Sequence, residues 1–126
     1  MTPKQIVESP RVHSPFGHYS SAVLRGNHLY MSGFGPFDTE KRLVGDNIAD
    51  QTHMTMRNIK NFLEDNGFTM DDIVRATVYL NDIADWSVFN EVYGQYFESS
   101  YPARTVVACQ LNGFLVEVEC TAIKGE

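Results

Sequence analysis

The segment 115-LVEVECTAI-123, near the C-terminal end of the chain, decides the fold class. Apolar and polar side chains alternate along it, and successive side chains of a β-strand point to opposite faces of the sheet. Val116 and Val118 therefore share one face with the cysteine and alanine that follow, while Glu117 and Glu119 share the other. The pattern predicts a strand that buries one face in a core and presents two neighbouring carboxylates on the opposite face.

The N-terminal part of the chain predicts a β-hairpin. Residues 19–26 (YSSAVLRG) and 28–33 (HLYMSG) are two strand-like runs, and the Gly26-Asn27 dipeptide between them favours a tight turn. Residues 34–45 contain a glycine-proline pair and mixed charges without periodicity, which is typical of a loop.

A first helix is predicted from about residue 46. Apolar residues then repeat every three or four positions, which places them on one broad face. Asp46 or Asn47 is placed to cap the start of this helix, and Asn66-Gly67 supplies a stop because glycine tolerates the left-handed conformation that ends helices.

Two more strands flank a second predicted helix. Residues 73–80 (IVRATVYL) are rich in β-branched side chains and predict a strand. Asp85 can cap a helix whose apolar face continues through Tyr96 and Phe97. Residues 105–111 (TVVACQL) predict a strand that ends at an Asn-Gly turn.

The predicted order is β-β-α-β-α-β-β within a single domain, residues 1–126. This order predicts an α+β fold, in which a single mixed or antiparallel sheet carries two helices on one face. No further element is predicted that could cover the other face of the sheet. We therefore expect subunits to pack sheet to sheet around a symmetry axis.

Composition and charge exclude several classes of protein. The 126-residue chain is 43% hydrophobic and 21% charged, as expected for one folded domain. Its net charge of −6, without a Lys/Arg cluster, argues against nucleic acid as a partner. No apolar run is long enough to span a membrane, and the N-terminus lacks a secretory pattern, so we expect a cytoplasmic protein without a membrane partner.

Four polar residues are candidates for chemistry. Arg104 follows Pro102-Ala103 at the start of a strand, where a fixed guanidinium can grip a carboxylate or pair with a surface acid. Glu117 and Glu119 share a face, so a carboxylate there gains a raised pKa if that face is buried against another subunit, and both stay ordinary acids if the face is wet or a neighbouring lysine pairs with them. Asn90 lies at the margin of the second helix, where it reaches an interface or stays on a solvated flank.

Metal and nucleotide sites are not expected. The four histidines have no HExxH or Cys/His ligand spacing, so we predict no metal. The two phosphate-binding glycine patterns, GxGxxG and GxxxxGK[ST], are both absent. The two cysteines are far apart and are expected to be reduced packing residues in buried strands.

Six short segments together carry a family resemblance. They are GHY (17–19), YMSG (30–33), FLEDNG (62–67), FNEVY (89–93), PART (102–105) and VEVE (116–119). In this order and spacing they resemble the reactive intermediate deaminase family, the RidA or YjgF-like proteins, from about residue 14 to residue 123. The resemblance implies a trimeric, chorismate-mutase-like fold with sites between subunits. It also implies hydrolysis of 2-aminoacrylate-type enamines and their imine tautomers to 2-keto acids and ammonia, without a cofactor.

The resemblance also implies roles for particular residues. Arg104 would bind the carboxylate of a small anionic substrate, and Glu117, with Glu119 as a possible partner, would hold or activate the attacking water. The remaining pocket residues would be Tyr19, Ser32, Gly33, Asn90 and the backbone of Val106. Val106 stands where many family members have a cysteine, and His18 replaces a common proline.

Two other functions are compatible with the same residues. One is deamination of a larger amino-dienoate such as 2-aminomuconate, which the Gly-His-Tyr segment and the altered final loop leave open. The other is a trimer that binds 2-keto acids as a regulatory protein and catalyses no reaction.

Overall fold

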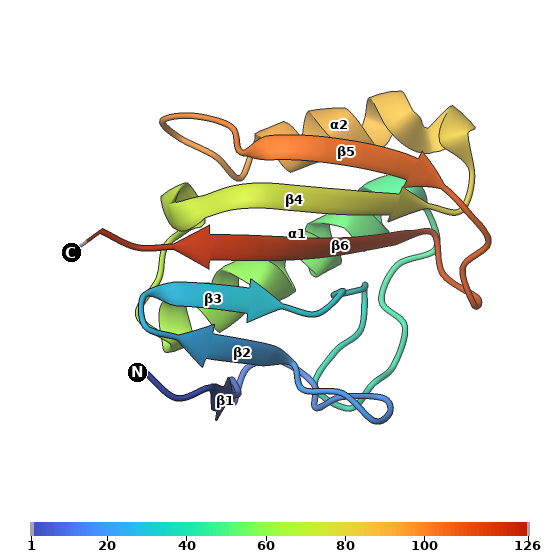
Figure 1. The fold of residues 1–126 in the computed structure, drawn as a ribbon. Coiled ribbons are helices and arrows are strands. Elements are labelled where there is room, and N and C mark those ends of the chain that lie inside the picture. Colours follow the sequence, from blue (N-terminus) through green and yellow to red (C-terminus); the bar gives the residue numbers. More distant parts are fainter. Residues whose placement is uncertain (1, 126) are drawn as a thin grey trace.

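The strand predicted at the C-terminus lies inside a six-stranded sheet, with the order β1-β2-β3-β6-β4-β5 (Figure 1). A computed structural model describes residues 2–125. The strands are β1 (Gln5–Val7), β2 (Ala22–Arg25), β3 (His28–Met31), β4 (Ile73–Leu80), β5 (Ala103–Ala108) and β6 (Val116–Ile123). The helices are α1 (Ile48–Asp65) and α2 (Trp86–Gly94), with short 3₁₀ turns at Met70–Asp72 and Ile83–Asp85.

The sheet is mixed, as predicted. β6 pairs antiparallel with β3 and with β4, whereas β4 and β5 are parallel because α2 forms the crossover between them. The α+β prediction is confirmed. β1 was not predicted, since a strand of three residues is too short to show an alternating pattern.

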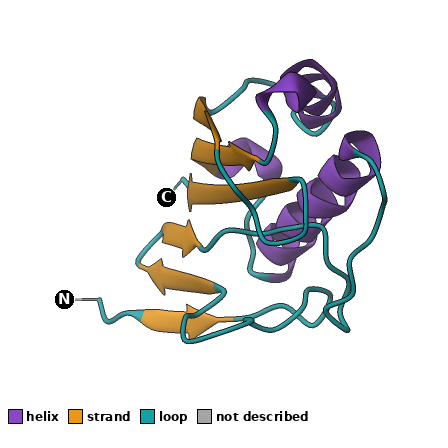
Figure 2. Ribbon diagram, turned by 90° about the vertical axis from the view of Figure 1, so that its right-hand side faces the viewer, coloured by secondary structure: helices purple, strands orange, loops and turns teal. Residues whose placement is uncertain are grey.

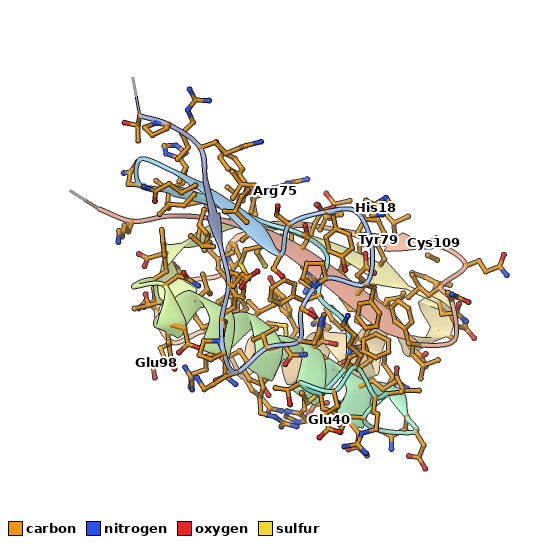
Figure 3. The ribbon with its side chains drawn as sticks, turned by 90° about the horizontal axis from the view of Figure 1, so that it is seen from below. His18, Glu40, Arg75, Tyr79, Glu98 and Cys109 are labelled. Atoms are coloured by element: carbon orange, nitrogen blue, oxygen red, sulfur yellow. The ribbon has the colours of Figure 1, made fainter. Side chains whose placement is uncertain are left out.

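The alternation in β6 fixes which face of the sheet is covered. Val116 and Val118 are fully buried beneath the helices. Glu117 and Glu119, which alternate with them along the strand, are only half-buried. Both helices lie on this one side (Figure 2). Arg75 and Tyr79 point to the opposite side (Figure 3), which no element of residues 2–125 covers.

α1 begins and ends as its sequence predicts. Of the two candidate caps the structure selects Asn47, whose side-chain oxygen accepts a hydrogen bond from the backbone N–H of Asp50 at 2.9 Å. The chain leaves the helix through Gly67, which has a φ of 82°. This left-handed conformation is the one that favours glycine after a helix.

α2 is shorter than predicted. It ends at Gly94, so Tyr96 and Phe97 lie beyond it, although Phe97 is still buried and its ring centroid lies 4.9 Å from that of Tyr93. The spacing of the apolar residues therefore indicated that one side of this segment is buried, and this burial continues beyond the end of the helix. Asp85 forms no side-chain cap.

The strand predicted for residues 105–111 begins earlier and ends earlier, at Ala103 and Ala108. Cys109 therefore lies outside the strand and is half-buried, while Cys120 is buried as expected, and both are free. Ala103 and Arg104 join the strand because they pair with Arg75 and Ala76 of β4, which local propensity alone does not indicate.

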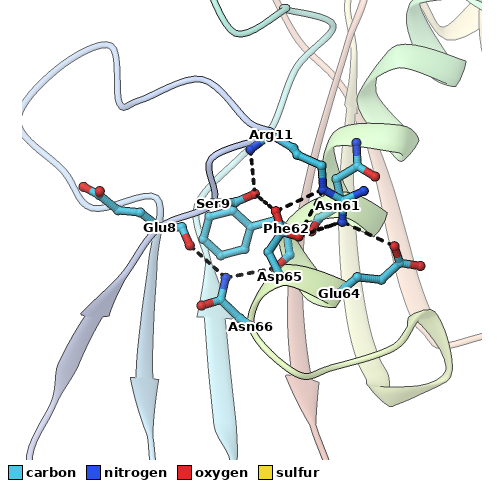
Figure 4. Close-up of polar contacts among 8 residues, drawn as sticks. All are labelled: Glu8, Ser9, Arg11, Asn61, Phe62, Glu64, Asp65 and Asn66. Carbon is cyan, nitrogen blue, oxygen red and sulfur yellow. Dashed lines mark hydrogen bonds and ion pairs between the residues drawn. The ribbon is translucent and has the colours of Figure 1, made fainter.

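The segment that follows β1 is fastened to the end of α1 (Figure 4). Arg11 donates to the Asp65 carboxylate through Nε at 3.0 Å and Nη2 at 2.7 Å, and Ser9 donates to the same carboxylate. Asn66 donates to the backbone carbonyl of Glu8 at 3.1 Å. These contacts fix the path of the chain that leads into the loop at residues 13–19.

Within residues 2–125, no helix has both the length and the apolar composition that crossing a membrane requires.

Replacing the cap of α1 tests its assignment. We expect Asn47→Ala to lower the free energy of unfolding by about 1 kcal/mol, because the N–H of Asp50 loses its acceptor. Asp46→Ala is the matched control, because it removes the exposed hydrogen bond from Asn47 Nδ2 to Asp46 but leaves the Asn47 acceptor in place, and we expect a loss of less than about 0.5 kcal/mol. Urea denaturation of both variants measures the difference, and equal losses would contradict the assignment.

Candidate functional site

Glu117 opens into a pocket between three loops. The pocket has a volume of about 330 Å³ and lies among residues 13–19, 33–37 and 112–114. A shallower groove beside it is lined by Tyr19, Ser32, Gly33, Glu117 and Glu119. The structure therefore places these five residues, all singled out from the sequence, next to one another.

Gly33 lies directly beneath the Glu117 side chain. A Cβ atom at Gly33 would lie 2.7 Å from Cδ of Glu117 and 3.0 Å from its Cγ. Non-bonded carbon atoms are most stable at about 3.5–4.0 Å, so any side chain at this position would displace the carboxylate. The φ of Gly33 is not in the left-handed region, so it is the close approach of the Glu117 side chain that favours glycine here.

The surroundings of Glu117 favour its protonated form. Burial raises the pKa of the Glu117 carboxyl above its ordinary value, and the negative charge of Glu119 raises it further. Within residues 2–125, no hydrogen bond to the Glu117 carboxylate offsets these effects. A carboxyl of this kind exchanges protons at higher pH than an ordinary glutamate, as a general acid or base requires.

Glu119 has a different environment although it lies only two residues away. The hydroxyl of Tyr79 donates a hydrogen bond to Oε1 of Glu119 at 2.6 Å. This bond and burial raise the pKa of Tyr79 to about 12, so the phenol keeps its proton near neutral pH. Glu119 is thus engaged with Tyr79, and Glu117 is the carboxylate left available.

Tyr19 and Ser32 hold the neighbouring loop in place. The Ser32 hydroxyl donates to the carbonyl of Ser20 at 2.6 Å, and its backbone N–H donates to that of Ser21 at 2.9 Å. The Tyr19 oxygen accepts a hydrogen bond from the backbone N–H of Phe16 at 3.0 Å, so its own proton is free to be donated. The groove therefore offers one hydroxyl donor close to the Glu117 carboxylate.

Arg104 lies against α2 within a group of aromatic rings. Its Cζ atom is 4.8 Å from the ring centroid of Tyr93, 5.7 Å from that of Trp86 and 5.9 Å from that of Phe89. These distances are in the range of cation-π interactions. Within the described residues Arg104 forms no ion pair with an acid.

Asn90 and Val106 lie near Arg104. Asn90 and Arg104 line the same hollow, which has a volume of about 390 Å³ and is closed on one side by Tyr101 and Pro102. Val106 follows Arg104 by two positions on β5, so both side chains point to the helix side of the sheet, where Val106 packs against the core.

Arg104 and Glu117 do not meet within one chain. The strand register pairs Arg104 with Ala76 and Glu117 with Tyr79. Ala76 is buried under the helices, whereas Tyr79 lies on the uncovered face (Figure 3), and paired residues share a face. The predicted site residues thus form two groups on opposite faces of the sheet.

Sequence analysis missed the aromatic residues of both groups. Phe16, Phe37 and Phe114 line the Glu117 pocket, and rings of α2 lie around Arg104. The available signal was that Phe16, Phe37 and Phe114 lie in loops that contain glycine or proline. No helical or strand periodicity there assigns an aromatic side chain to the core.

The histidines lie apart from one another. Nδ1 of His13 is 2.9 Å from the carbonyl oxygen of Ser14, and Nδ1 of His53 is 2.8 Å from the hydroxyl oxygen of Tyr96. Among residues 2–125, no group of three or more His, Cys, Asp or Glu side chains could hold a metal ion.

Comparisons with known proteins cover nearly the whole chain. The family model for endoribonuclease L-PSP matches residues 10–124. A RutC family protein of Pyrococcus horikoshii is 37% identical over 124 residues, which are 96% of this chain and 98% of that protein. The 2-iminobutanoate/2-iminopropanoate deaminase of Bos taurus is 37% identical over 125 residues, 97% of this chain and 91% of that enzyme. A solved structure of a Rid family protein of unknown function from Yersinia pestis is also similar, with a TM-score of 0.91 and 33% sequence identity. The match covers 97% of this chain and 100% of the Yersinia pestis chain.

The electrostatic coupling between the two glutamates can be measured directly. We expect Glu117 to titrate above the ordinary pKa of glutamate, and Glu119→Gln to lower the pKa of Glu117, because it removes a neighbouring negative charge. An NMR pH titration of the carboxyl carbons measures both values. Glu98→Gln, at an exposed position, should leave the pKa of Glu117 unchanged, and an unchanged value in Glu119→Gln would contradict the coupling.

Proposed function

The chain belongs to the endoribonuclease L-PSP family, which is the YjgF/RidA family, and we propose that it hydrolyses 2-imino acids and their enamine tautomers to 2-keto acids and ammonia. The observation that carries the proposal is the half-buried, raised-pKa carboxyl of Glu117, which lies over Gly33 and has no hydrogen-bond partner within residues 2–125. The deaminase relative from Bos taurus supports the choice of substrate class.

Glu117 carries the proton transfers in the proposed mechanism. It accepts a proton from a water molecule whose oxygen forms a bond with the imine carbon. It returns this proton to the nitrogen, which gives a carbinolamine. It then carries the hydroxyl proton of the carbinolamine to the nitrogen, so that the carbonyl forms, the C–N bond breaks and ammonia leaves. General acid and base catalysis of this kind contributes about 10²–10⁴ in rate.

Arg104 binds the substrate carboxylate in this proposal. A guanidinium can donate two parallel hydrogen bonds to a carboxylate, which fixes the orientation of the adjoining imine carbon. The rings of Trp86, Phe89 and Tyr93 stabilise the guanidinium cation. Unlike an acidic side chain, they leave its N–H groups available to the substrate carboxylate. Asn90 and the backbone of Val106 complete this side, while Tyr19, Ser32 and Gly33 form the side near Glu117.

The site requires a second chain, and we propose a homotrimer assembled through the uncovered face of the sheet. Arg104 and Glu117 lie on opposite faces of one chain, so adjoining protomers must supply one each. The uncovered face carries exposed apolar side chains, among them Tyr30 and Val107. Exposed apolar surface of this kind is typical of a protein interface.

Three other functions are alternatives to the proposed hydrolysis of 2-imino acids. A larger amino-dienoate would place a second carboxylate near the pocket, and a regulatory trimer would bind 2-keto acids without turnover. The name of the family model also raises RNA cleavage, which the net charge of −6 disfavours. RNA cleavage that survives Glu117→Gln, or keto-acid binding without imine turnover, would contradict the proposal.

Single substitutions test the two proposed catalytic residues. We expect Arg104→Ala and Glu117→Gln each to lower the rate of 2-keto acid release from 2-aminoacrylate by at least about 10². 2-Aminoacrylate is generated from serine by a dehydratase, and the rate is taken above that of spontaneous hydrolysis. Arg42→Ala and Glu40→Gln, an exposed ion pair outside both groups, are the matched controls. Full activity in either test variant would refute the role of that residue.

Mixing the two inactive variants tests the shared site. If one protomer supplies Arg104 and its neighbour supplies Glu117, trimers assembled from equal amounts of both variants contain some intact sites. Random assembly should restore about one quarter of the wild-type activity. The variants are unfolded and refolded together, with each variant refolded alone as the control. No recovery in mixed trimers of demonstrated composition would show that both residues act from the same chain.

A further inference from the structure

Three phenylalanine rings form an apolar wall next to Glu117. Phe16 and Phe37 have ring centroids 5.0 Å apart, and Phe37 and Phe114 have centroids 5.2 Å apart, both pairs in edge-to-face geometry. All three line the same pocket as the carboxylate. The wall is therefore continuous with the position where the proposed reaction takes place.

The wall is held in place from below. Asn58 is buried and donates from Nδ2 to the carbonyls of Gly35 at 3.0 Å and Phe37 at 2.9 Å. A Cβ atom at Gly35 would lie 2.9 Å from Cε2 of Phe37, so glycine makes room for this ring. His13, which is also buried, packs edge-on against Phe16 with ring centroids 4.9 Å apart. The pocket is thus organised before any ligand enters it.

Phe16 is fixed although it lies at the surface. Its side chain is 51% exposed, yet Lys41 lies with Nζ 5.4 Å from the ring centroid and donates to the carbonyl of Pro15 at 3.0 Å. Its backbone N–H is bound by the Tyr19 oxygen. An exposed ring held by several contacts beside a catalytic carboxyl presents apolar surface that a ligand can cover.

We propose that this pocket, formed by Phe16, Phe37 and Phe114, binds an aromatic side chain of the 2-imino acid substrate. The inference rests on the proposed function and narrows its substrate class. A volume of about 330 Å³ is within the range of about 300–1,000 Å³ that small-ligand pockets span. Aromatic rings pack favourably against one another in the offset and edge-to-face arrangements that the wall offers.

The charges of the pocket argue against other substrates. Apart from Glu117, its lining contains no acidic side chain and no lysine or arginine. A second carboxylate, as in an amino-dienoate, would lose hydration without gaining a cation from the lining, and the nearby Lys41 donates to the carbonyl of Pro15. A cationic side chain would have only Glu117 as its partner, and would hold that group ionised and occupied. A small aliphatic side chain would leave most of the wall exposed to water.

The reaction is the same hydrolysis for an aromatic substrate. The water oxygen bonds to the imine carbon, the C–N bond breaks, and ammonia and an aryl-substituted 2-keto acid leave, with no change of oxidation state. The ring takes no part in the bond changes. Its contacts with the wall place the imine carbon against Glu117, so they contribute to positioning and to specificity.

A comparison of two imino acids tests the inference. The imino acids of phenylalanine and of alanine are generated by an amino acid oxidase in the presence of catalase. The release of 2-keto acid above the spontaneous rate is then measured with the full-length wild-type chain. We expect kcat/KM to be at least about tenfold higher for the phenylalanine-derived imine, because an apolar pocket rewards each added group that it can enclose.

Variants of the wall give the matched comparison. Phe16→Ala and Phe114→Ala should each reduce the ratio of the two kcat/KM values by about tenfold. Val88→Ala, at an exposed position on α2, should leave the ratio unchanged. Circular dichroism establishes that each variant is folded, and Phe114→Leu provides a second variant that keeps an apolar side chain without the ring.

The outcomes separate this inference from the proposed function. If wild type hydrolyses the alanine-derived imine equally well or better, or if the ratio is the same in folded wall variants, the aromatic assignment is overturned and the deaminase proposal stands. If neither imine is hydrolysed faster than in buffer, the proposed function itself fails. A preference for the phenylalanine-derived imine that is lost in Phe16→Ala and Phe114→Ala supports both.

Discussion

The alternation of side chains along β6 is the constraint on which the rest of the structure depends. Full burial of a valine contributes about 1.5–3 kcal/mol, so Val116 and Val118 anchor the strand beneath the helices. A shift of one residue would turn Glu117 and Glu119 into the core, which makes the register strongly determined. The same burial that stabilises the domain therefore delivers two carboxylates to the uncovered face.

The uncovered face then gives these two carboxylates different properties. Tyr79 donates to Glu119 and occupies it, while Glu117 lies over Gly33 without a comparable donor. Burial and the charge of Glu119 raise the pKa of Glu117. Groups with identical chemistry, two residues apart, thus become suited to different tasks because Tyr79 occupies Glu119 and leaves Glu117 available.

The arrangement of Arg104 explains why a small domain with one core would need partners to act. Its strand lies at the edge of the sheet, and its side chain is directed toward α2, away from the face that carries Glu117. Aromatic rings on α2 lie against the guanidinium, which forms no ion pair with an acid within residues 2–125. Half of the proposed site is therefore presented at one face of the chain, and the other half at the opposite face.

The sequence by itself determined five of the six strands, both helices and the stop after α1, because alternation, helical spacing and turn residues are local properties of the chain. It also singled out Arg104 and Glu117 through their neighbours in the sequence. It did not predict β1 or where α2 ends. Only the tertiary structure decided that Glu117 rather than Glu119 is the available carboxylate, that Arg104 lies on the other face, and that Phe16, Phe37 and Phe114 form a wall. These features depend on contacts between segments distant in the sequence, which local patterns do not encode.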